Sequence, residues 1–268
     1  MHPRLIEAEQ LHAQLQRPEL LLVDMRTPPA YAAGHIPGAR QLDYSALVRS
    51  RPPAMGLLPE PAALAPVLSR LGLSPDAWVV AYDDEGNGRA ARLLWTLEVL
   101  GHPHLSLLDG GLPAWLAAGL PLSREAPPAA PGSYAVNLAN PAAYADKDYV
   151  LAHLGDPDVV LLDTRSPAEY AGLDVRAARG GHIPGAVNFN WTEAMDPIRQ
   201  LRLKPAAELR ALLRSCGATP DKEVIVYCQT HHRSAHTYWV LKHLGYRRVR
   251  GYAGAWSEWG NDPALPIE

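Results

Sequence analysis

The chain has 268 residues, 47% of them hydrophobic and 20% charged, and its net charge at pH 7 is −3. This composition excludes a disordered chain, and no apolar stretch approaches the roughly 18 residues of a membrane span. The balance of 25 basic against 28 acidic residues argues against nucleic acid or a membrane surface as the partner. The opening segment lacks the apolar core of a secretory signal, so we expect a cytoplasmic protein.

Short apolar runs alternate with helical patterns along the chain. Four runs are too short for stable helices and are predicted to be buried strands, at Leu20–Val23, Val79–Tyr82, Val159–Leu162 and Val224–Tyr227. The intervening stretches predict helices over Leu64–Leu71, Arg92–Leu100, Ala206–Leu213 and Ala235–Leu244. A further helix is predicted to begin after the N-cap residue Ser166, with Pro167 at its first position and Glu169 completing a capping box. Alternating strands and helices predict an α/β fold with a mainly parallel sheet.

Two sequence blocks occur in both halves of the chain. Segment 22–31 returns in similar form at 161–170, and Gly-His-Ile-Pro-Gly-Ala at 34–39 returns unchanged at 181–186. A period of about 140 residues is the size of a domain rather than of a solenoid repeat. We therefore predict two similar α/β domains that arose by duplication.

The region between the copies suggests where the domains meet. A stretch rich in Pro and Ala begins at Ala126 and has no periodicity, as is typical of a linker. We expect a first domain at 1–125, a linker at 126–139 and a second domain at 140–268. The second copy has eight extra residues between its two blocks, and this insertion contains Asp174, Arg176 and Arg179.

The copies differ most clearly after their central strands. The strand ending at Tyr82 continues into the acidic segment 83–85, whereas the strand ending at Tyr227 continues as Cys228-Gln229-Thr230-His231-His232-Arg233-Ser234. A loop that leads from a buried strand into a helix gathers N–H groups and the positive end of the helix dipole, which favours an anion. The pKa of Cys228 should therefore be lowered, and the acidic first domain should be catalytically silent.

Several other polar residues are interpreted as structural. The two cysteines cannot form a disulfide framework or a four-cysteine metal site, although a single bridge between them stays open. Cys216 precedes Gly217 at a predicted helix end and is interpreted as a packing residue. His35 and His182 occur in both copies, which favours a role in the turn, and the same holds for the Asp-x-Arg motifs at 24–26 and 163–165.

Together, these residues resemble those of the tandem-domain rhodaneses over nearly the whole chain. Asp-x-Arg with Ser/Thr-Pro and Tyr, the Gly-His-Ile-Pro-Gly-Ala block, the cysteine loop and a final Gly-Tyr-Ala-Gly-Ala-Trp at 251–256 occur in family order. The resemblance implies two tandem rhodanese-like domains, of which the first is inactive. It also implies that Cys228 carries sulfane sulfur as a persulfide, from a small anionic donor such as thiosulfate to cyanide or a thiol, without metal or organic cofactor.

The resemblance also suggests which residues meet the substrate: Gln229, Thr230, His231, His232, Arg233 and Arg179. Arg233 either stabilises the loop from outside or contacts the substrate. Arg179 is similar in placement to family arginines at the rim of the site, and a solvated surface role is nearly as plausible. The histidines favour a small dianion and a pH-dependent preference. The loop departs both from the thiosulfate pattern with Arg and Lys after Cys and from the Gly-Ser-Gly-Val-Thr pattern of 3-mercaptopyruvate sulfurtransferases, so the latter activity is an alternative.

Two rival functions use the same loop. In a cysteine phosphatase five residues separate Cys from Arg, whereas four separate Cys228 from Arg233 and no aspartic general acid is evident nearby. A persulfide carrier for a protein partner would need the same cysteine and would hand its sulfur to that protein. Turnover with a small acceptor distinguishes the enzyme from the carrier.

Overall fold

The computed structural model describes residues 2–129, 132 and 134–268, so positions 130, 131 and 133 of the predicted linker lie outside the described residues. The chain folds into two compact units. Unit 1 consists of Met1–Leu47, Pro59–Ala139 and Asp196–Leu203, and unit 2 of Val48–Leu58, Asn140–Met195 and Lys204–Glu268. Each unit thus includes one short segment from the other half of the chain. The boundaries at 125/126 and 139/140 stay a prediction.

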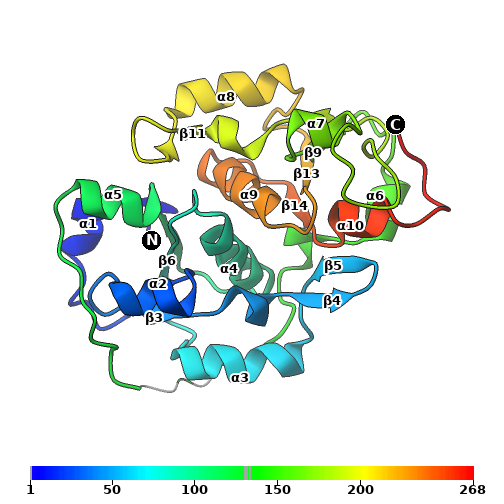
Figure 1. Ribbon diagram of the computed structural model, residues 1–268. Coiled ribbons are helices and arrows are strands. Elements are labelled where there is room, and N and C mark those ends of the chain that lie inside the picture. Colours follow the sequence, from blue (N-terminus) through cyan, green and yellow to red (C-terminus); the bar gives the residue numbers. More distant parts are fainter. Residues whose placement is uncertain (1, 130–131, 133) are drawn as a thin grey trace. The chain divides into compact units, whose positions relative to one another are not determined.

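Unit 1 is built on a five-stranded parallel sheet in the order β1-β7-β6-β2-β3. Its elements are β1 (Leu5–Ile6), α1 (Ala8–His12), β2 (Leu20–Asp24), α2 (Pro28–Ala33), β3 (Arg40–Gln41), η1 (Tyr44–Leu47), α3 (Pro61–Leu71), β6 (Trp78–Tyr82), α4 (Gly88–Val99), β7 (Leu105–Leu108) and α5 (Gly111–Ala117). Helix α4 packs against β6 and β7, and Figure 1 shows α4 beside β6. Residues of α1 and α5, among them Leu11 and Trp115, share one buried cluster with Leu22 and Val80 of the sheet.

Unit 2 repeats this plan with a five-stranded parallel sheet in the order β10-β9-β13-β14-β8. Its elements are β4 (Arg49–Arg51), β5 (Ala54–Leu57), η2 (Pro141–Ala143), β8 (Tyr144–Ala145), α6 (Lys147–Ala152), β9 (Val159–Asp163), α7 (Pro167–Tyr170), β10 (Val187–Asn188), η3 (Trp191–Ala194), α8 (Ala206–Ser215), β13 (Glu223–Tyr227), α9 (Arg233–His243), β14 (Val249–Tyr252) and α10 (Ala255–Trp259). Helix α9 packs on β13 and β14. Val150 of α6 and Trp256 of α10 join a buried cluster with Ile225 of the sheet.

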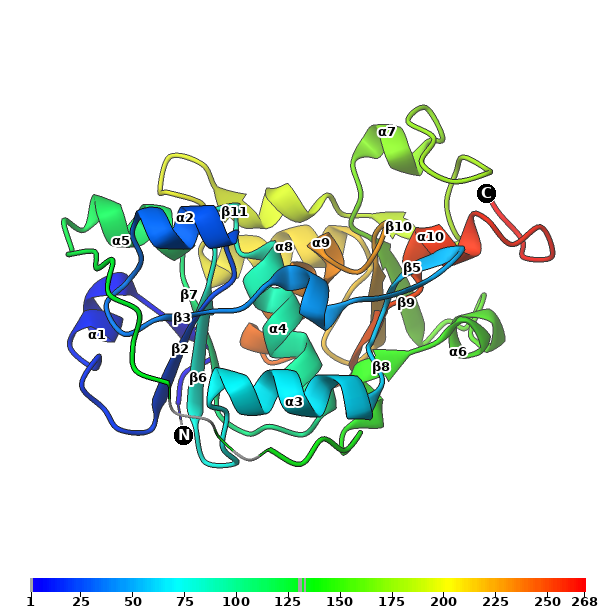
Figure 2. The same ribbon diagram turned by 60° about the horizontal axis from the view of Figure 1, so that its bottom comes forward.

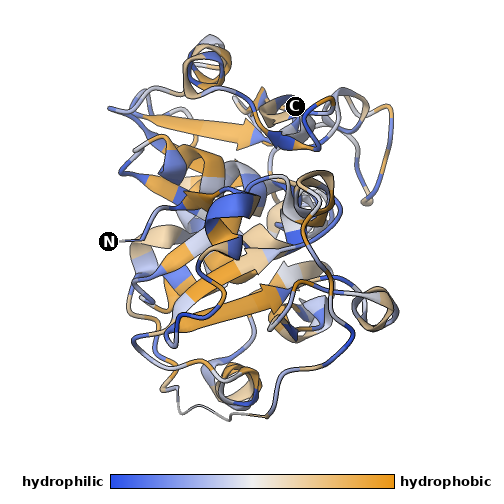
Figure 3. Ribbon diagram, turned by 90° about the vertical axis from the view of Figure 1, so that its left-hand side faces the viewer, coloured by the Kyte–Doolittle hydropathy of each residue, from blue (hydrophilic) through white to orange (hydrophobic). Residues whose placement is uncertain are grey.

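All four predicted strands are present, and each is one residue longer than its apolar run. The four predicted helices are present as α3, α4, α8 and α9, with ends that differ by at most four residues. The strands of both sheets are strongly hydrophobic (Figure 3), which is expected of parallel strands covered on both faces. The mainly parallel α/β prediction is therefore confirmed. Among the described residues, no helix is both long and apolar enough to span a membrane.

Two short segments lie in the unit that their sequence position does not suggest. Strands β4 and β5 pair antiparallel and belong to unit 2, where β5 lies against α10 (Figures 1 and 2). The Met55 N–H donates to the Ser257 hydroxyl at 3.0 Å. Conversely, β11 (Met195–Asp196) and β12 (Arg202–Leu203) lead into and out of the segment that joins unit 1, where the Leu203 N–H donates to the Asp109 carboxylate at 2.8 Å.

Candidate active site

Cys228 lies at the carboxyl end of β13, between this strand and α9. Strand β13 pairs with β9 on one side and β14 on the other, so the loop after it leaves the middle of the parallel sheet. This is where ligands bind in open α/β sheets. The Cys228 side chain is buried, with 1% of the residue exposed. A polar loop around a buried thiol is unlike the surroundings of a cysteine that only packs.

The surroundings of the sulfur favour a thiolate. Burial alone raises the pKa of Cys228, but the charge of Arg233 and hydrogen bonds from the Ser234 hydroxyl and from the N–H groups of Ser234 and Thr230 outweigh it. The pKa therefore lies below the ordinary value, as the position of the loop predicts. A thiol of this kind is a good nucleophile and a good leaving group.

The equivalent loop of unit 1 reveals what these N–H groups do. Asp83 follows β6 as Cys228 follows β13, and its buried carboxylate accepts four backbone N–H bonds at 2.7–3.1 Å. The donors are the N–H groups of Glu85, Asn87, Arg89 and Ala90. The loop of unit 1 is thus an anion cradle that its own side chain already occupies. The predicted silence of the first copy stays a prediction, and this occupied cradle adds a physical argument for it beyond the repulsion of anions by acidic residues.

Arg233, the first residue of α9, makes a bidentate ion pair with Glu169 of α7. Its two terminal nitrogens lie 2.5 and 2.8 Å from the carboxylate oxygens, and the Glu169 side chain is 1% exposed. Burial favours the neutral acid, but hydrogen bonds and charge from Arg233, with the Ser166 N–H and Arg176, lower the pKa of Glu169 to about 2. Arg233 also hydrogen-bonds the Cys228 sulfur. Of the two roles left open by the sequence, stabilising the loop is the one this geometry favours.

The sequence identified Glu169 only as part of a capping box, and that box is present in α7. Its ion pair with Arg233 was not predicted, although the sequence contains a signal for it. The first copy has Ala30 at the position of Glu169 and Gly88 at that of Arg233. The pair therefore occurs only in the copy that has the cysteine, and comparing the copies at both positions would have found it.

The two arginines of the insertion lie in different surroundings. The guanidinium of Arg179 donates to the carbonyls of four residues after or at the end of α10: Trp259, Gly260, Asp262 and Leu265. Contact between Arg179 and the substrate stays a prediction, and these bonds favour a structural role. Arg176, in contrast, has a half-exposed side chain with Nε 3.7 Å from the Glu169 carboxylate.

The remaining predicted site residues are anchored in different ways. The Gln229 side-chain amide donates to the Arg176 carbonyl at 2.9 Å, and the Gln229 backbone carbonyl accepts from the Ser257 N–H. The His232 ring lies 6.0 Å from that of Trp191 in η3. His231 is fully buried and adopts a left-handed backbone with φ of +56°. These contacts hold the loop residues around Cys228.

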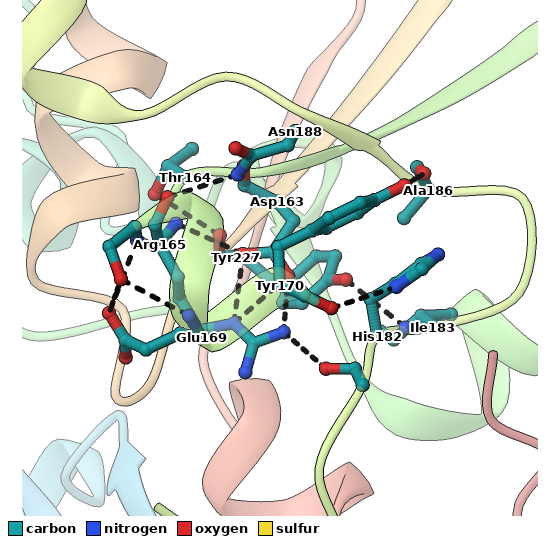
Figure 4. A network of polar contacts seen from close by, with 12 residues as sticks. Asp163, Thr164, Arg165, Glu169, Tyr170, His182, Ile183, Ala186, Asn188 and Tyr227 are labelled. Atoms are coloured by element: carbon teal, nitrogen blue, oxygen red, sulfur yellow. Dashed lines mark hydrogen bonds and ion pairs between the residues drawn. The ribbon is translucent and has the colours of Figure 1, made fainter. Parts of the chain in front are cut away.

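A network of polar contacts, drawn in Figure 4, joins residues at the carboxyl ends of β9 and β13. Arg165 binds the buried Asp163 carboxylate through Nε and Nη2 and also donates to the Gly181 carbonyl at 2.7 Å. His182 stacks on Tyr170 and contacts its carbonyl at 3.0 Å. The same contacts occur in unit 1 among the equivalent residues Asp24, Arg26, Tyr31 and His35. The structural interpretation of these residues is thus confirmed.

Cys216 differs from Cys228 in every respect that matters for reactivity. It is the C-cap residue of α8, just before Gly217, whose φ is +74°. Burial raises the pKa of its thiol. Both cysteines are free, so the bridge left open by the sequence is absent. In the described part of the chain, no cluster of three or more His, Cys, Asp or Glu residues could hold a metal ion.

Strand β5 brings Gly56 against the cysteine loop. A Cβ at Gly56 would meet the carbonyls of Thr230 and Ala253 more closely than real Cβ atoms approach. We expect Gly56→Ala to displace the Thr230 backbone, including the N–H that bonds the sulfur, and to slow sulfur uptake by about tenfold, the value of one hydrogen bond to a charged group. Single-turnover kinetics with thiosulfate measure this rate. Met55→Ala, at an exposed neighbour on the same strand, serves as the control, and equal rates for both variants would contradict the prediction.

Comparison with known proteins identifies the family. The model of the rhodanese-like domain matches residues 7–118 and again 146–262. A protein named thiosulfate sulfurtransferase from Pseudomonas aeruginosa is 50% identical over 266 residues, which cover 99% of this chain and 97% of that protein. The "Sulfur carrier protein TtuD" of Thermus thermophilus is 36% identical over 280 residues, covering 99% and 97% of the two chains.

Two further matches concern substrate and fold. A "Probable 3-mercaptopyruvate sulfurtransferase" of Pseudomonas aeruginosa is 36% identical over 284 residues, covering 98% of this chain and 97% of that protein. The crystal structure of YnjE superposes with a TM-score of 0.89 at 25% identity, covering 98% of this chain and 68% of that one. The chain therefore belongs to the rhodanese family, with one rhodanese-like domain in each half.

Proposed function

We propose that this protein is a thiosulfate sulfurtransferase in which Cys228 carries the sulfur. The observation that carries the proposal is the lowered pKa of a buried cysteine held by N–H groups, Ser234 and Arg233. Full-length similarity to a protein named thiosulfate sulfurtransferase supports the choice of reaction. The donor is a small sulfur anion, and the acceptor is cyanide or a thiol.

The reaction has two balanced steps. The Cys228 thiolate attacks the outer sulfur of thiosulfate, a new S–S bond forms, the S–S bond of thiosulfate breaks, and sulfite leaves with the electron pair. Cyanide then attacks the outer persulfide sulfur through carbon, so thiocyanate departs and the Cys228 thiolate is regenerated. No metal or organic cofactor takes part in either step.

The loop residues are assigned roles by analogy with the filled cradle of unit 1. A carboxylate oxygen of aspartate and the outer sulfur of a cysteine persulfide each lie two bonds beyond Cβ. The N–H groups that meet Asp83 in unit 1 therefore suggest where the loop from Gln229 to Ser234 holds the anionic outer sulfur. Arg233 adds positive charge, and His231 and His232 complete the polar wall. Arg179 would act indirectly, by holding the segment after α10.

The test is an intact-mass measurement with and without thiosulfate. We expect a gain of about 32 Da, one sulfur atom, that cyanide removes. The same gain should appear in a Cys216→Ala variant, because that thiol is not the nucleophile. Mercaptopyruvate as donor in a parallel sample tests the alternative substrate. No adduct with either donor would overturn the proposal and favour the phosphatase alternative.

A second function, sulfur carriage to a protein acceptor, is favoured by similarity to the protein named sulfur carrier TtuD. The two functions share the persulfide and differ in the second step. Rapid thiocyanate formation over many cycles would support the enzyme. A persulfide that resists cyanide and small thiols but passes to a protein thiol would support the carrier.

A further inference from the structure

The backbone of His231 is unusual for its residue type. Its φ of +56° lies in the left-handed region, which glycine adopts readily and residues with a side chain adopt uncommonly. The equivalent position in the loop of unit 1 is Gly86, with φ of +85°. The catalytic copy thus places a histidine where the silent copy places the residue that suits the conformation. Strain of this kind at a candidate site is a reason to look for a function of the side chain.

The His231 side chain makes one contact that bears on the sulfur. Its ring is fully buried, and Nδ1 lies 2.7 Å from the hydroxyl oxygen of Ser234, which is also fully buried. The Ser234 hydroxyl in turn hydrogen-bonds the Cys228 sulfur. A hydroxyl has a single proton, so it donates to the sulfur only when its oxygen accepts from His231.

The silent copy has neither member of this pair. Gly86 has no side chain, and Arg89 stands at the position of Ser234. The arrangement therefore accompanies the cysteine in the same way as the Glu169–Arg233 pair does. Residues needed only to form the loop should be common to both copies, as Asp24 and Asp163 are.

We propose that His231 and Ser234 form a hydrogen-bonded relay that directs the Ser234 hydroxyl proton at the Cys228 sulfur and so stabilises the thiolate. The inference rests on the proposed function and adds two roles to it. Ser234 touches the reacting sulfur and is a catalytic residue, whereas His231 acts through Ser234 and is a positioning residue. No proton leaves the relay: the Nδ1 proton stays on His231 and the hydroxyl proton on Ser234. The relay acts at both steps, because each begins or ends with a thiolate.

Other charged and titratable groups near the loop could also change the pKa of Cys228. Arg233 stays paired with Glu169 and does not titrate near neutrality. His236 of α9 is buried, and burial together with His232 lowers its pKa to about 4. His232 is the remaining loop histidine. The variants that test the relay must therefore leave Arg233, Glu169 and His232 in place, so that a change in the pKa of Cys228 comes from the relay alone.

The experiment follows the thiolate ultraviolet absorbance against pH in a Cys216→Ala background, with Cys228→Ala subtracted. We expect Ser234→Ala to raise the apparent pKa of Cys228 and to slow persulfide formation at pH 7 about tenfold, as loss of a hydrogen bond to a charged group predicts. His231→Gly should shift the pKa in the same direction by a smaller amount. Glycine suits the left-handed backbone, as Gly86 demonstrates, so this variant should fold.

Non-additivity distinguishes a relay from two separate effects. The double variant should resemble Ser234→Ala, because His231 acts only through that hydroxyl. Ser215→Ala, which loses an exposed hydroxyl bonded within α8, should leave the pKa unchanged. An unchanged pKa in Ser234→Ala, or additive shifts in the double variant, would overturn the relay. Shifts as expected without any sulfur adduct from thiosulfate would support the relay and count against the proposed function instead.

Discussion

A Cys228→Ala variant is expected to form no sulfur adduct and to lose at least about 10⁴-fold in thiosulfate:cyanide turnover, equivalent to about 5 kcal/mol of transition-state stabilisation. Both half-reactions use this sulfur, first as nucleophile and then as leaving group. No other group in the loop replaces it, since the hydroxyl of Ser234 would have to form an alkoxide. Steady-state kinetics together with intact mass measure both losses.

The fold should survive this substitution. Alanine removes only a buried sulfur of modest size, and the Arg233 charge keeps its ion pair with Glu169. We therefore expect a Tm within a few degrees of the parent, so that lost turnover cannot be ascribed to unfolding. Cys216→Ala is the matched control and should keep its turnover. Residual activity of more than a few per cent in a folded Cys228→Ala variant would contradict the assigned nucleophile.

Glu169→Gln should lose both stability and turnover. Removing one partner of a buried ion pair leaves the Arg233 charge uncompensated, a cost of about 3 kcal/mol at neutral pH. Turnover should fall about 100-fold, the usual effect of losing a preorganised group beside developing charge, because Arg233 also contacts the Cys228 sulfur. Denaturant unfolding and steady-state kinetics measure these two changes.

The stability of the parent should depend on this carboxylate in acid. The pKa of Glu169 is about 2 in the folded protein and 4.5 ordinarily, so its contribution is present above pH 4.5 and is lost as the pH falls toward 2. The double variant Glu169→Gln/Arg233→Met should regain much of the stability without regaining turnover, since no unpaired charge remains buried. A Glu169→Gln variant with the parent's acid unfolding curve would refute this account.

Much of this site could be predicted from local sequence. Strand β13, the start of α9 and the polar loop between them follow from hydrophobic runs and from the contrast between Cys228 and Asp83. The lowered pKa of Cys228 follows from the same placement, because N–H groups after a parallel strand create the same field whatever the rest of the fold.

What the sequence did not reveal depends on contacts between distant positions. Glu169 and Arg233 are 64 positions apart, and each has a sufficient local explanation, as a helix cap and as a helix start. Segment 48–58 contains two short strands and two prolines, too little for a periodic signal, and only packing assigns it to unit 2. The contact of Gly56 with Thr230 could therefore not be predicted from the sequence.

The exchanged segments limit how far either half of this protein is autonomous. A chain cut between residues 126 and 129 would give two fragments, each still carrying a piece of the other's folded unit. The bond from Met55 to Ser257 and that from Leu203 to Asp109 would then join them as a non-covalent complex. A fragment that begins at Asn140 would keep the Cys228 thiol but lack β5, the strand that abuts the Thr230 carbonyl. Each half of the chain therefore supplies a segment that completes the folded unit built mainly by the other half.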